Sequence, residues 1–396
     1  MVAFSKLTTS LALQLLASGS LAHPGEEHDH AQLRRDISLR DLHAAHGARA
    51  LAQCSNSATA RRLKQRSVQR RADKVRALRD ARGLSSTTPQ KYRRDLAALE
   101  AWEEVNHNET GVYDYDMFSS IESVFDTNTS CILAPEVTAG PYYVLDEYFR
   151  SNVKESEYSE GVDLFLEVQY VDISTCAPVP DVAVDIWNAN ATGVYSGIYT
   201  SGNYAAEGVN STYLRGIQLT DHEGVVSYET IFPGHYEGRA THTHLLAHTN
   251  VTLLPNGTIS LFNKPVSHIG QLFYPETLRS AVEATYPYNT NTVDVTTNDG
   301  DMWSIVQADD TYDPFPQFLY LGDDITDGLF AWIQIGINAS ADYQTDEYYA
   351  VAGYLAADGG HAETSALTGI GGGGEGGNGT APGGAAPSRT AIPASA

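Results

Sequence analysis

The residues best suited to chemistry lie between Pro233 and His244, where metal-capable side chains gather at the junction of two β-rich runs. His242 and His244 are two residues apart, so in a strand their side chains share one face, about 6 to 7 Å apart along the chain. Tyr236 follows a Pro-Gly turn six residues before His242, and a fold-back would bring its phenol near both imidazoles. A His-x-His pair is also common as two hydrogen-bonded histidines, but the nearby tyrosine favours a metal site.

Tyr195 is a second candidate phenol, in a turn-like stretch after the apolar run that ends at Trp187. The chain has 23 tyrosines, and spacing alone does not single this one out. Two phenolates with two imidazoles would suit a hard trivalent ion better than the sulfur ligands of structural zinc sites do. Because a free phenol has a pKa of about 10, the ion's charge would be needed to keep a tyrosine ionised. Ferric iron, one ion per chain, is the natural candidate.

The elements that must position these residues are short and β-rich. Apolar and β-branched residues concentrate at 162–171, 182–187, 225–231, 242–248 and 330–337. Pro-Gly, Asn-Gly and Asp-Gly pairs occur between such runs, and this frequent punctuation is typical of an all-β fold. Roughly 250 residues are ample for one domain with a sizeable core. We therefore predict an antiparallel β-sandwich over residues 108–358.

Three further segments flank this domain. Residues 1–22 have the features of a secretory signal peptide, with Lys6 before an apolar stretch and a small-residue exit. Residues 23–107 are basic, and their apolar spacing predicts one amphipathic helix over 56–82, ended by Gly83. Its thin apolar stripe favours a solvated helix or a removable pro-segment over a nucleic-acid arm. Residues 359–396 are rich in Gly, Ala, Pro and Ser, and we expect them to be disordered.

Charge is divided unevenly along the chain, whose net charge is −24. The first 100 residues hold 18 of the 25 Lys and Arg, whereas the remainder holds 7 against 40 acids. Such an acidic domain repels phosphate backbones and anionic lipid, which argues against nucleic-acid and membrane-surface partners. After the signal peptide the chain contains no apolar run of about 18 residues, so we expect a secreted, extracellular protein without a membrane-embedded body.

Sequons and cysteines agree with secretion. Eight asparagines stand two residues before Ser or Thr and are candidate glycosylation sites: Asn108, Asn128, Asn190, Asn210, Asn250, Asn256, Asn338 and Asn378. Three cysteines permit three alternative single disulfides. We favour Cys131 with Cys176, since both lie in the β-rich region, and this pairing leaves Cys54 over.

Several motifs together resemble the intradiol ring-cleavage dioxygenase family, and in particular its secreted fungal branch. The resemblance runs from about Cys131 to Ile337. The motifs are Asp185-Ile-Trp-Asn-Ala-Asn, Gly193-Val-Tyr195, Arg215-Gly, Thr220-Asp-His-Glu-Gly224, Tyr228-Glu-Thr-Ile-Phe-Pro-Gly-His-Tyr236, Arg239-Ala-Thr-His-Thr-His244 and Gln271-Leu-Phe-Tyr274. The order Tyr, Tyr, His-x-His is highly specific for this family.

The resemblance implies a role for each matching residue. It makes Tyr195 and Tyr236 the equatorial and axial tyrosinates of a non-haem Fe(III) centre, with His242 and His244 as the equatorial and axial imidazoles. Arg239 would stabilise negative charge on the substrate ring.

Two further residues match the family's substrate pocket. Gly140-Pro-Tyr-Tyr143 makes Tyr143 one candidate, and Gln271 is the other. The implied reaction opens catechol-type rings with O2 to cis,cis-muconic acid derivatives.

Two other readings remain open. The first is a secreted metal-binding sandwich that holds copper or zinc without oxygenase chemistry, and the second is a cell-wall or matrix protein, suggested by the Gly-rich tail and the sequons. Only five residues separate Tyr236 from His242, fewer than in better-known members of the family, so substrate preference does not transfer. The sequence also leaves a homodimer open.

Overall fold

A computed structural model describes residues 49–84, 132–133, 137–155, 160–199, 203–251, 259–307, 313–346 and 348–363 of the chain. It also describes residues 35, 38, 42, 45–47 and 158. All of these belong to one compact unit, Leu21–Ile370. The predicted signal peptide, Cys131, the sequons at Asn108, Asn128, Asn256 and Asn378, and most of the tail lie outside the described residues.

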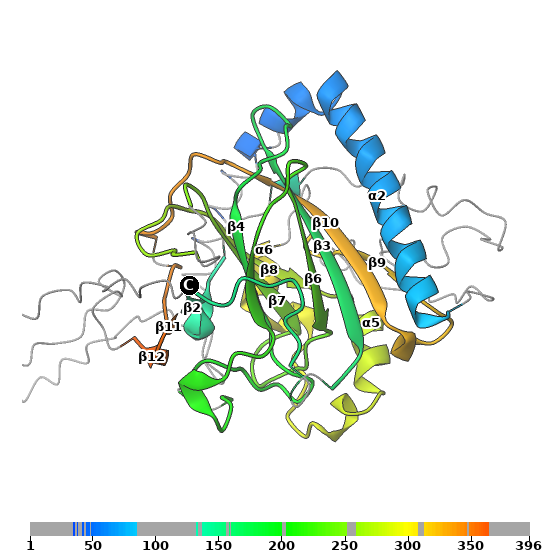
Figure 1. The fold of residues 1–396 in the computed structure, drawn as a ribbon, viewed down its shortest axis with the longest axis vertical. Helices are drawn as coiled ribbons and strands as arrows, with labels where there is room; N and C mark the ends of the chain where they lie inside the picture. The colour runs from blue at the N-terminus through cyan, green and yellow to red at the C-terminus, as the bar shows by residue number, and fades with distance from the viewer. Residues whose placement is uncertain are drawn as a thin grey trace, which may run out of the picture. The chain divides into compact units, whose positions relative to one another are not determined.

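The described residues form three β-sheets (Figure 1). The five-stranded sheet has the order β1–β10–β3–β6, with β9 also paired to β10; its members are β1 (Ile132–Leu133), β3 (Asp163–Asp172), β6 (Val225–Ile231), β9 (Gln317–Tyr320) and β10 (Leu329–Ile337). The four-stranded sheet runs β5 (Arg215–Leu219), β4 (Ala183–Trp187), β7 (His242–His248) and β8 (Val266–Phe273). The three-stranded sheet runs β12 (Gly359–Ala362), β11 (Gly353–Ala356) and β2 (Val144–Leu145).

Helical segments are few. The α-helices are α2 (Ala58–Arg82), α5 (Glu276–Glu283) and α6 (Met302–Gln307), and the 3-10 turns are η1 (Gly140–Tyr142), η2 (Gly208–Asn210), η3 (Tyr288–Thr290), η4 (Asn298–Gly300) and η5 (Ile325–Asp327). None of the helices among the described residues is long and apolar enough to cross a membrane. The described part of the chain is therefore mostly β, as the sequence predicted.

The main core lies between the two larger sheets. Leu164, Leu166 and Val168 alternate along β3, so they face the same side and pack in one cluster with Val184 and Ile186 of β4. Further members of this cluster come from β6, β7, β8 and β10. The two sheets thus bury their apolar faces against each other, and β7 lies inside the four-stranded sheet, between β4 and β8.

The prediction of antiparallel pairing is wrong for two of the three sheets. In the three-stranded sheet β11 pairs with β2 in parallel. In the five-stranded sheet β10 pairs with β3 in parallel, in a register that runs from Leu329 opposite Leu164 to Ile337 opposite Asp172. Parallel neighbours need a long crossover connection, and here the connection includes the whole four-stranded sheet. The bounds of individual strands were predicted better. Those of β6 and β7 agree with the apolar runs in the sequence.

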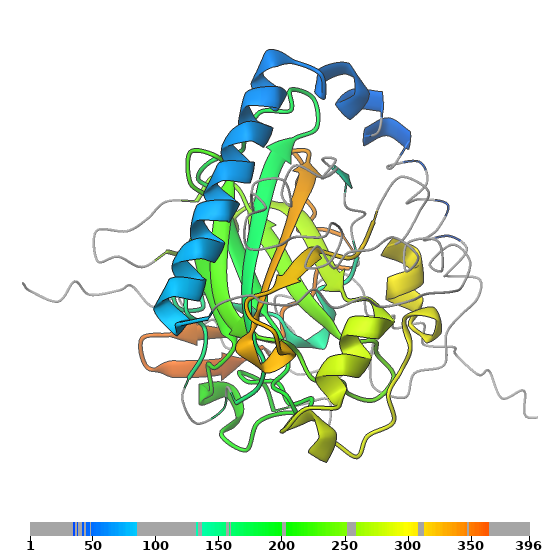
Figure 2. The ribbon, with the colours of Figure 1, turned by 90° about the vertical axis from the view of Figure 1, so that its right-hand side faces the viewer.

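Helix α2 is packed against the sandwich instead of being solvated, which corrects the expectation from its thin apolar stripe. Ser57 caps its start and Gly83, with φ of 65°, ends it where the sequence predicted. Ala72 and Val75 of α2 are fully buried and pack with Phe330 and Trp332 of β10. Both ribbon views show α2 lying along β3 and β10 (Figures 1 and 2).

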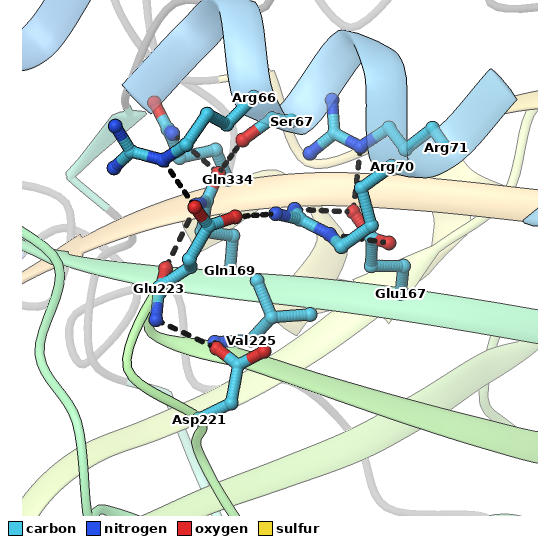
Figure 3. Close-up of polar contacts among 10 residues, drawn as sticks. All are labelled: Arg66, Ser67, Arg70, Arg71, Glu167, Gln169, Asp221, Glu223, Val225 and Gln334. Atoms are coloured by element: carbon cyan, nitrogen blue, oxygen red, sulfur yellow. Dashed lines mark hydrogen bonds and ion pairs between the residues drawn. The ribbon is translucent and has the colours of Figure 1, made fainter. Parts of the chain in front are cut away.

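Ion pairs explain how so basic a helix lies on the sheet (Figure 3). Glu167 of β3, itself buried, accepts hydrogen bonds from Arg70 and from Arg71, the latter at 2.7 Å. Glu223 pairs with Arg66 and Arg70. These carboxylates neutralise arginines that the sequence suggested were exposed to water.

The disulfide joins Cys54 to Cys176, so the predicted Cys131–Cys176 pair is wrong. The two Cα atoms are 5.6 Å apart, within the range for a disulfide. The bond ties the segment before α2 to the loop after β3, across 122 positions of the sequence. The sequence argument failed because it placed Cys54 in a segment that was assumed not to pack on the sandwich.

Loss of this disulfide should destabilise the protein. The Cys54→Ser variant is expected to lose about 2 to 5 kcal/mol of unfolding free energy, because a crosslink over a long loop restricts the unfolded chain. Denaturant unfolding of both proteins measures the difference. Cys131→Ser is the matched control and should unfold like the wild type, with the Cys54–Cys176 peptide intact in a non-reducing digest. If Cys131→Ser removes the disulfide and Cys54→Ser does not, the pairing is wrong.

The end of the domain also differs from its predicted boundary. The composition assigned residues 359–396 to a disordered tail, but Gly359–Ala362 form β12, which pairs antiparallel with β11. Glycine-rich sequence gave no apolar pattern for this strand. Its backbone contacts hold it instead: Gly360 N donates to Asn210 Oδ1, and a Cβ at residue 360 would meet the Val209 carbonyl oxygen.

Candidate metal centre

Strand β7 places His242 and His244 side by side, as their spacing predicts. Both are buried, and their Nε2 atoms are 3.0 Å apart. The central position of β7 fixes them, because His244 lies opposite Trp187 of β4 on one side and Gln271 of β8 on the other. The indole of Trp187 stacks on the His244 ring at a centroid distance of 4.6 Å, which further restricts that ring.

Both imidazoles are neutral electron-pair donors. Burial, and then the charge of Arg239, lowers the pKa of His242 to about 3. Burial and the neighbouring His242 lower the pKa of His244 well below its ordinary value. The carbonyl of Ala240 accepts a 2.6 Å hydrogen bond from His242 Nδ1, so the proton sits there and Nε2 keeps its lone pair. Such an orientation by a backbone carbonyl is typical of metal-binding histidines.

Tyr236 and Tyr195 bring two phenols to the same place. The Tyr236 hydroxyl is 3.4 Å from His242 Nε2. The ring of Tyr195 makes edge contacts with Tyr236 and with His244, at centroid distances of 5.5 and 6.3 Å. Burial raises the pKa of both phenols, and a side-chain hydrogen bond between Tyr195 and Tyr236 lowers the pKa of Tyr195 and raises that of Tyr236. These oxygens would ionise only beside a strong positive charge.

Gly193 allows the two tyrosine-bearing loops to meet. Its φ of 81° is in the region that side chains rarely adopt, and a Cβ there would lie 2.2 Å from the carbonyl oxygen of His235. The turn from Asn190 to Tyr195 is thereby brought against the residue before Tyr236. Glycine is therefore required at position 193 for the pair of phenols to form.

The four side chains fit a hard metal ion. Two bare imidazole nitrogens face each other, the Tyr236 phenol oxygen lies within hydrogen-bond distance of one of them, and the Tyr195 ring contacts both Tyr236 and His244. This is the mixed nitrogen and phenolate-oxygen set expected for Fe(III), without sulfur. The described residues contain no group of three or more His, Cys, Asp or Glu that could hold a metal.

Arg239 is held beside these residues by Asp301 and Gln271. Its Nε donates to Asp301 Oδ2 at 2.8 Å and its Nη2 donates to Gln271 Oε1 at 2.5 Å. Burial alone would lower the pKa of Arg239, but the carboxylate of Asp301 raises it, so the guanidinium stays charged. Its Nη1 is buried and has no partner among the described residues, which leaves one donor for another molecule.

Asp301 is a positioning residue that the sequence did not reveal. One carboxylate oxygen accepts from Arg239 and from the backbone N–H of Ala240, and the other accepts from the N–H of Trp303 at the start of α6. The side chain is fully buried. Asp301 alone thus links the Arg239 guanidinium both to Ala240, just before β7, and to α6. An Asp before a short helix is a recognisable cap, but nothing in the sequence links it to Arg239.

The Asp301→Asn variant should lower kcat about 10- to 100-fold, the usual effect of removing a partner that orients a functional group. The amide keeps the size of the carboxylate but not its charge, so Arg239 loses its ion pair. Metal content should remain that of the wild type, because Asp301 has no hydrogen bond to the four donors. Asp299→Asn, a change at an exposed neighbour, is the control and should keep full activity. Equal kcat values for Asp301→Asn and the wild type would refute the role.

Tyr142, and not the predicted Tyr143, lies against the phenols. Tyr142 stacks on Tyr195 at a centroid distance of 4.2 Å, and its hydroxyl donates to Asn203. Tyr143 is turned to a different cluster, with its hydroxyl 2.9 Å from His248 Nε2 and 3.2 Å from Asp185 Oδ2. Consecutive residues point in different directions, and the matching motif does not show which of the two faces the site. The substrate role of Tyr143 therefore stays a prediction with no geometric support.

The buried acid Glu147 has a raised pKa, and this has a testable consequence. Burial raises the pKa of Glu147 to about 7, although Arg215 lies 3.8 Å away and opposes the shift. Between pH 4.5 and 7 the folded chain therefore binds more protons at this residue than the unfolded chain does. The contribution of this carboxyl to stability is therefore greatest at low pH, where it is protonated, and is lost as the pH rises through 7.

The Glu147→Gln variant should remove this contribution. As the pH rises from 4.5 to 8, the unfolding free energy of the wild type should fall by about 3 kcal/mol more than that of the variant, since each pKa unit corresponds to about 1.4 kcal/mol. Chemical denaturation at a series of pH values measures the difference, with the exposed Glu160→Gln as control. Parallel pH profiles for Glu147→Gln and the wild type would contradict the raised pKa.

Comparison with known proteins shows the family to which the chain is similar. The family model described as Dioxygenase matches residues 139–252, a range that contains all four donor residues. No curated protein matches the chain. Among solved structures, an intradiol ring-cleavage dioxygenase from Tetranychus urticae is 30% identical, covering 54% of this chain and 97% of its own, with a TM-score of 0.44.

Two more distant structures carry related names. The dioxygenase domain of a dioxygenase and carbohydrate-binding fusion from Streptomyces sp. SirexAA-E is 20% identical, covering 51% of this chain and 97% of its own, with a TM-score of 0.32. A catechol 1,2-dioxygenase from Acinetobacter sp. ADP1 is 18% identical, covering 51% of this chain and 61% of its own, with a TM-score of 0.32.

Proposed function

Because the chain belongs to the intradiol ring-cleavage dioxygenase family, we propose that it binds one ferric ion through Tyr195, Tyr236, His242 and His244 and uses it to open catechol-type rings. The products would be cis,cis-muconic acid derivatives. One observation carries the assignment: two neutral imidazoles and two phenols from separate loops converge in a buried site. Histidines in such a cluster without a metal would normally pair with acids or carbonyls through both nitrogens.

The division of labour follows from the contacts. Tyr195, Tyr236, His242 and His244 would hold Fe(III), which would supply the Lewis acidity that makes the ring of a bound catechol reactive toward dioxygen. His242, held by the Ala240 carbonyl, and His244, stacked on Trp187, are fixed ligands. Tyr236 is the expected acceptor, at its hydroxyl oxygen, of a proton from the substrate.

Arg239 would act by charge. Its guanidinium, fixed by Asp301 and Gln271, keeps Nη1 available for the substrate. A buried, preorganised cation stabilises negative charge that develops on the ring more strongly than water does. Both atoms of O2 enter the two new carboxyl groups, so no external reductant is required.

Secretion is part of the proposal. The Cys54–Cys176 disulfide suits an oxidising compartment. Of the sequon asparagines within the described residues, Asn210, Asn250 and Asn338 are exposed and Asn190 is partly buried. These features support the signal peptide that the first 22 residues predict.

The reaction is tested with 18O2. The purified full chain, supplied with iron and catechol, should give a muconic acid that carries one labelled oxygen in each carboxyl group, as measured by mass spectrometry. Cleavage beside the two hydroxyls instead of between them would contradict the intradiol assignment, and so would the absence of any ring-opened product from a panel of substituted catechols.

A further inference from the structure

The loop that carries Tyr195 has less support from the sheets than the strand that carries the two histidines. Tyr195 lies outside the strands, and its backbone makes an isolated bridge with Tyr204. Its N–H donates to the Asn203 carbonyl, and its carbonyl accepts from the N–H of Ala205. A phenol on such a loop needs further contacts to hold it in place if it is to bind a metal ion.

Arg215, the first residue of β5, supplies such contacts to the residue that follows Tyr195. Its Nη2 donates to the Ser196 carbonyl at 2.6 Å. Its Nε donates to the same carbonyl at 3.1 Å and to Ser196 Oγ at 3.0 Å. Ser196 Oγ in turn donates to the Tyr213 carbonyl at 2.6 Å. The guanidinium therefore fixes both the carbonyl and the hydroxyl of Ser196.

Gly197 allows the loop to lie directly against this guanidinium. Its φ of 74° is in the region that side chains rarely adopt, and a Cβ there would lie 3.0 Å from Arg215 Nε and 3.4 Å from its Cζ. The Arg215 side chain is only 1% exposed, so it is enclosed by the sheet on one side and by the loop on the other. The loop and the guanidinium thus form one packed unit.

The four-stranded sheet places Arg215 in the same row as a proposed metal ligand. Arg215 lies opposite Trp187 of β4, Trp187 lies opposite His244 of β7, and His244 lies opposite Gln271 of β8. Residues directly opposite one another in a sheet point to the same face. The row therefore carries one imidazole of the donor set and, through Arg215, the loop that bears a phenol of that set.

The charge of Arg215 also acts on the phenol. A guanidinium stays protonated in proteins, so this buried cation is permanent. Its nearest acid is Glu147, whose Oε1 lies 3.8 Å from Arg215 Nε. Burial raises the pKa of Tyr195, and Arg215 is one of the groups that oppose this rise. The cation therefore favours the ionised phenol in addition to holding the loop.

We propose that Arg215 is the positioning residue for Tyr195: by holding the carbonyl and the hydroxyl of Ser196, it keeps the Tyr195 phenol in the donor set. The inference rests on the proposed function in one respect, since the phenol that Arg215 positions is a proposed iron ligand. Arg215 itself is not a ligand and acts through the loop.

Arg215→Lys tests the proposal, because lysine keeps the charge but lacks the planar fork of donors. Hydrogen exchange of the full chain, followed by mass spectrometry before and after iron is added, should be about tenfold faster for the amides of residues 193–198. Arg279→Lys is the matched control. Arg279 is equally buried, but its side chain bonds to Glu276, Thr296 and Asn298 instead of the Tyr195 loop, so exchange at 193–198 should stay unchanged.

Iron binding separates positioning from a role in folding alone. In competition with a chelator, Arg215→Lys should bind Fe(III) about 10- to 100-fold more weakly than the wild type, the usual effect of losing a group that orients a ligand. The visible band of phenolate bound to Fe(III) should shift. Arg279→Lys should change neither property. Arg215→Met with Glu147→Gln is the second variant: it leaves no unpaired buried charge at this ion pair, so it should fold and show the same weakened iron binding.

Unchanged exchange at 193–198 in both Arg215 variants would overturn the proposal. Faster exchange with an unchanged band and unchanged iron affinity would also overturn it, because Arg215 would then support the fold without positioning the ligand. Equal weakening of iron binding in Arg279→Lys leads to the same conclusion. Failure of the iron assignment is distinguishable, since the wild type would then lack the phenolate band, whereas the exchange rates still show whether Arg215 orders the Tyr195 loop.

Discussion

His242→Ala is expected to give a folded chain that binds no stoichiometric iron and opens no catechol ring. His242 supplies one of the two imidazole nitrogens of the donor set. Its Nε2 lies 3.0 Å from His244 Nε2, so both nitrogens can bind the same ion. Activity should fall at least about a thousandfold, beyond the 10- to 100-fold typical of losing only a supporting partner. Iron content by atomic emission and turnover of catechol measure the two effects.

The control for this variant lies on the same strand. His248 is also a buried, neutral imidazole of β7, and burial lowers its pKa to about 4, but it contacts Tyr143 and the Lys264 carbonyl instead of the donor set. His248→Gln keeps a donor and an acceptor there and should retain iron. If His242→Ala binds as much iron as His248→Gln, His242 is not a ligand.

Arg239→Met is expected to lower kcat about 100- to 1000-fold without removing the metal, because it deletes the preorganised cation but not a donor atom. The change leaves Asp301 buried without its partner, which should cost about 3 to 5 kcal/mol of stability. Steady-state kinetics, iron content and thermal unfolding separate these effects.

A double variant distinguishes catalysis from folding. Arg239→Met with Asp301→Asn should recover much of the lost stability, since no charge is then left unpaired, yet kcat should stay low. Recovery of kcat together with stability would show that Arg239 supports the fold and does not act on the substrate.

The sequence predicted the local parts of this site well. Alternation within β7 placed His242 and His244 on one face, because side-chain direction in a strand depends only on residue parity. Gly83 ended α2 where expected, since a left-handed cap is a local signal. Tyr195 was different: only the resemblance to a family selected it among 23 tyrosines.

Contacts between distant segments were not predictable in the same way. Asp301 reaches Arg239 across 62 residues, and Glu167 reaches Arg71 across 96, so neither pairing leaves a mark at the sequence level. The burial of α2 was missed because its arginines look solvated until their carboxylate partners on the sheet are known. The Cys54–Cys176 disulfide was missed for the same reason. Cys54 lies just before α2, so its closeness to Cys176 becomes apparent only when α2 is known to pack on the sheet.

Tyr142 shows the limit of motif reasoning. The motif Gly140-Pro-Tyr-Tyr143 suggests an aromatic residue near the site, but the turn η1 decides which ring enters. It directs Tyr142 onto Tyr195 and Tyr143 toward Asp185.

The visible absorption spectrum of the iron-replete full chain tests the central claim most directly, because phenolate bound to Fe(III) absorbs strongly through charge transfer. We predict a broad visible band and a burgundy colour, a shift of the band when catechol is added, and loss of the band in the Tyr195→Phe/Tyr236→Phe double variant. A colourless protein that contains one iron per chain, or a band that persists in the double variant, would contradict the assignment of these two tyrosines as iron ligands.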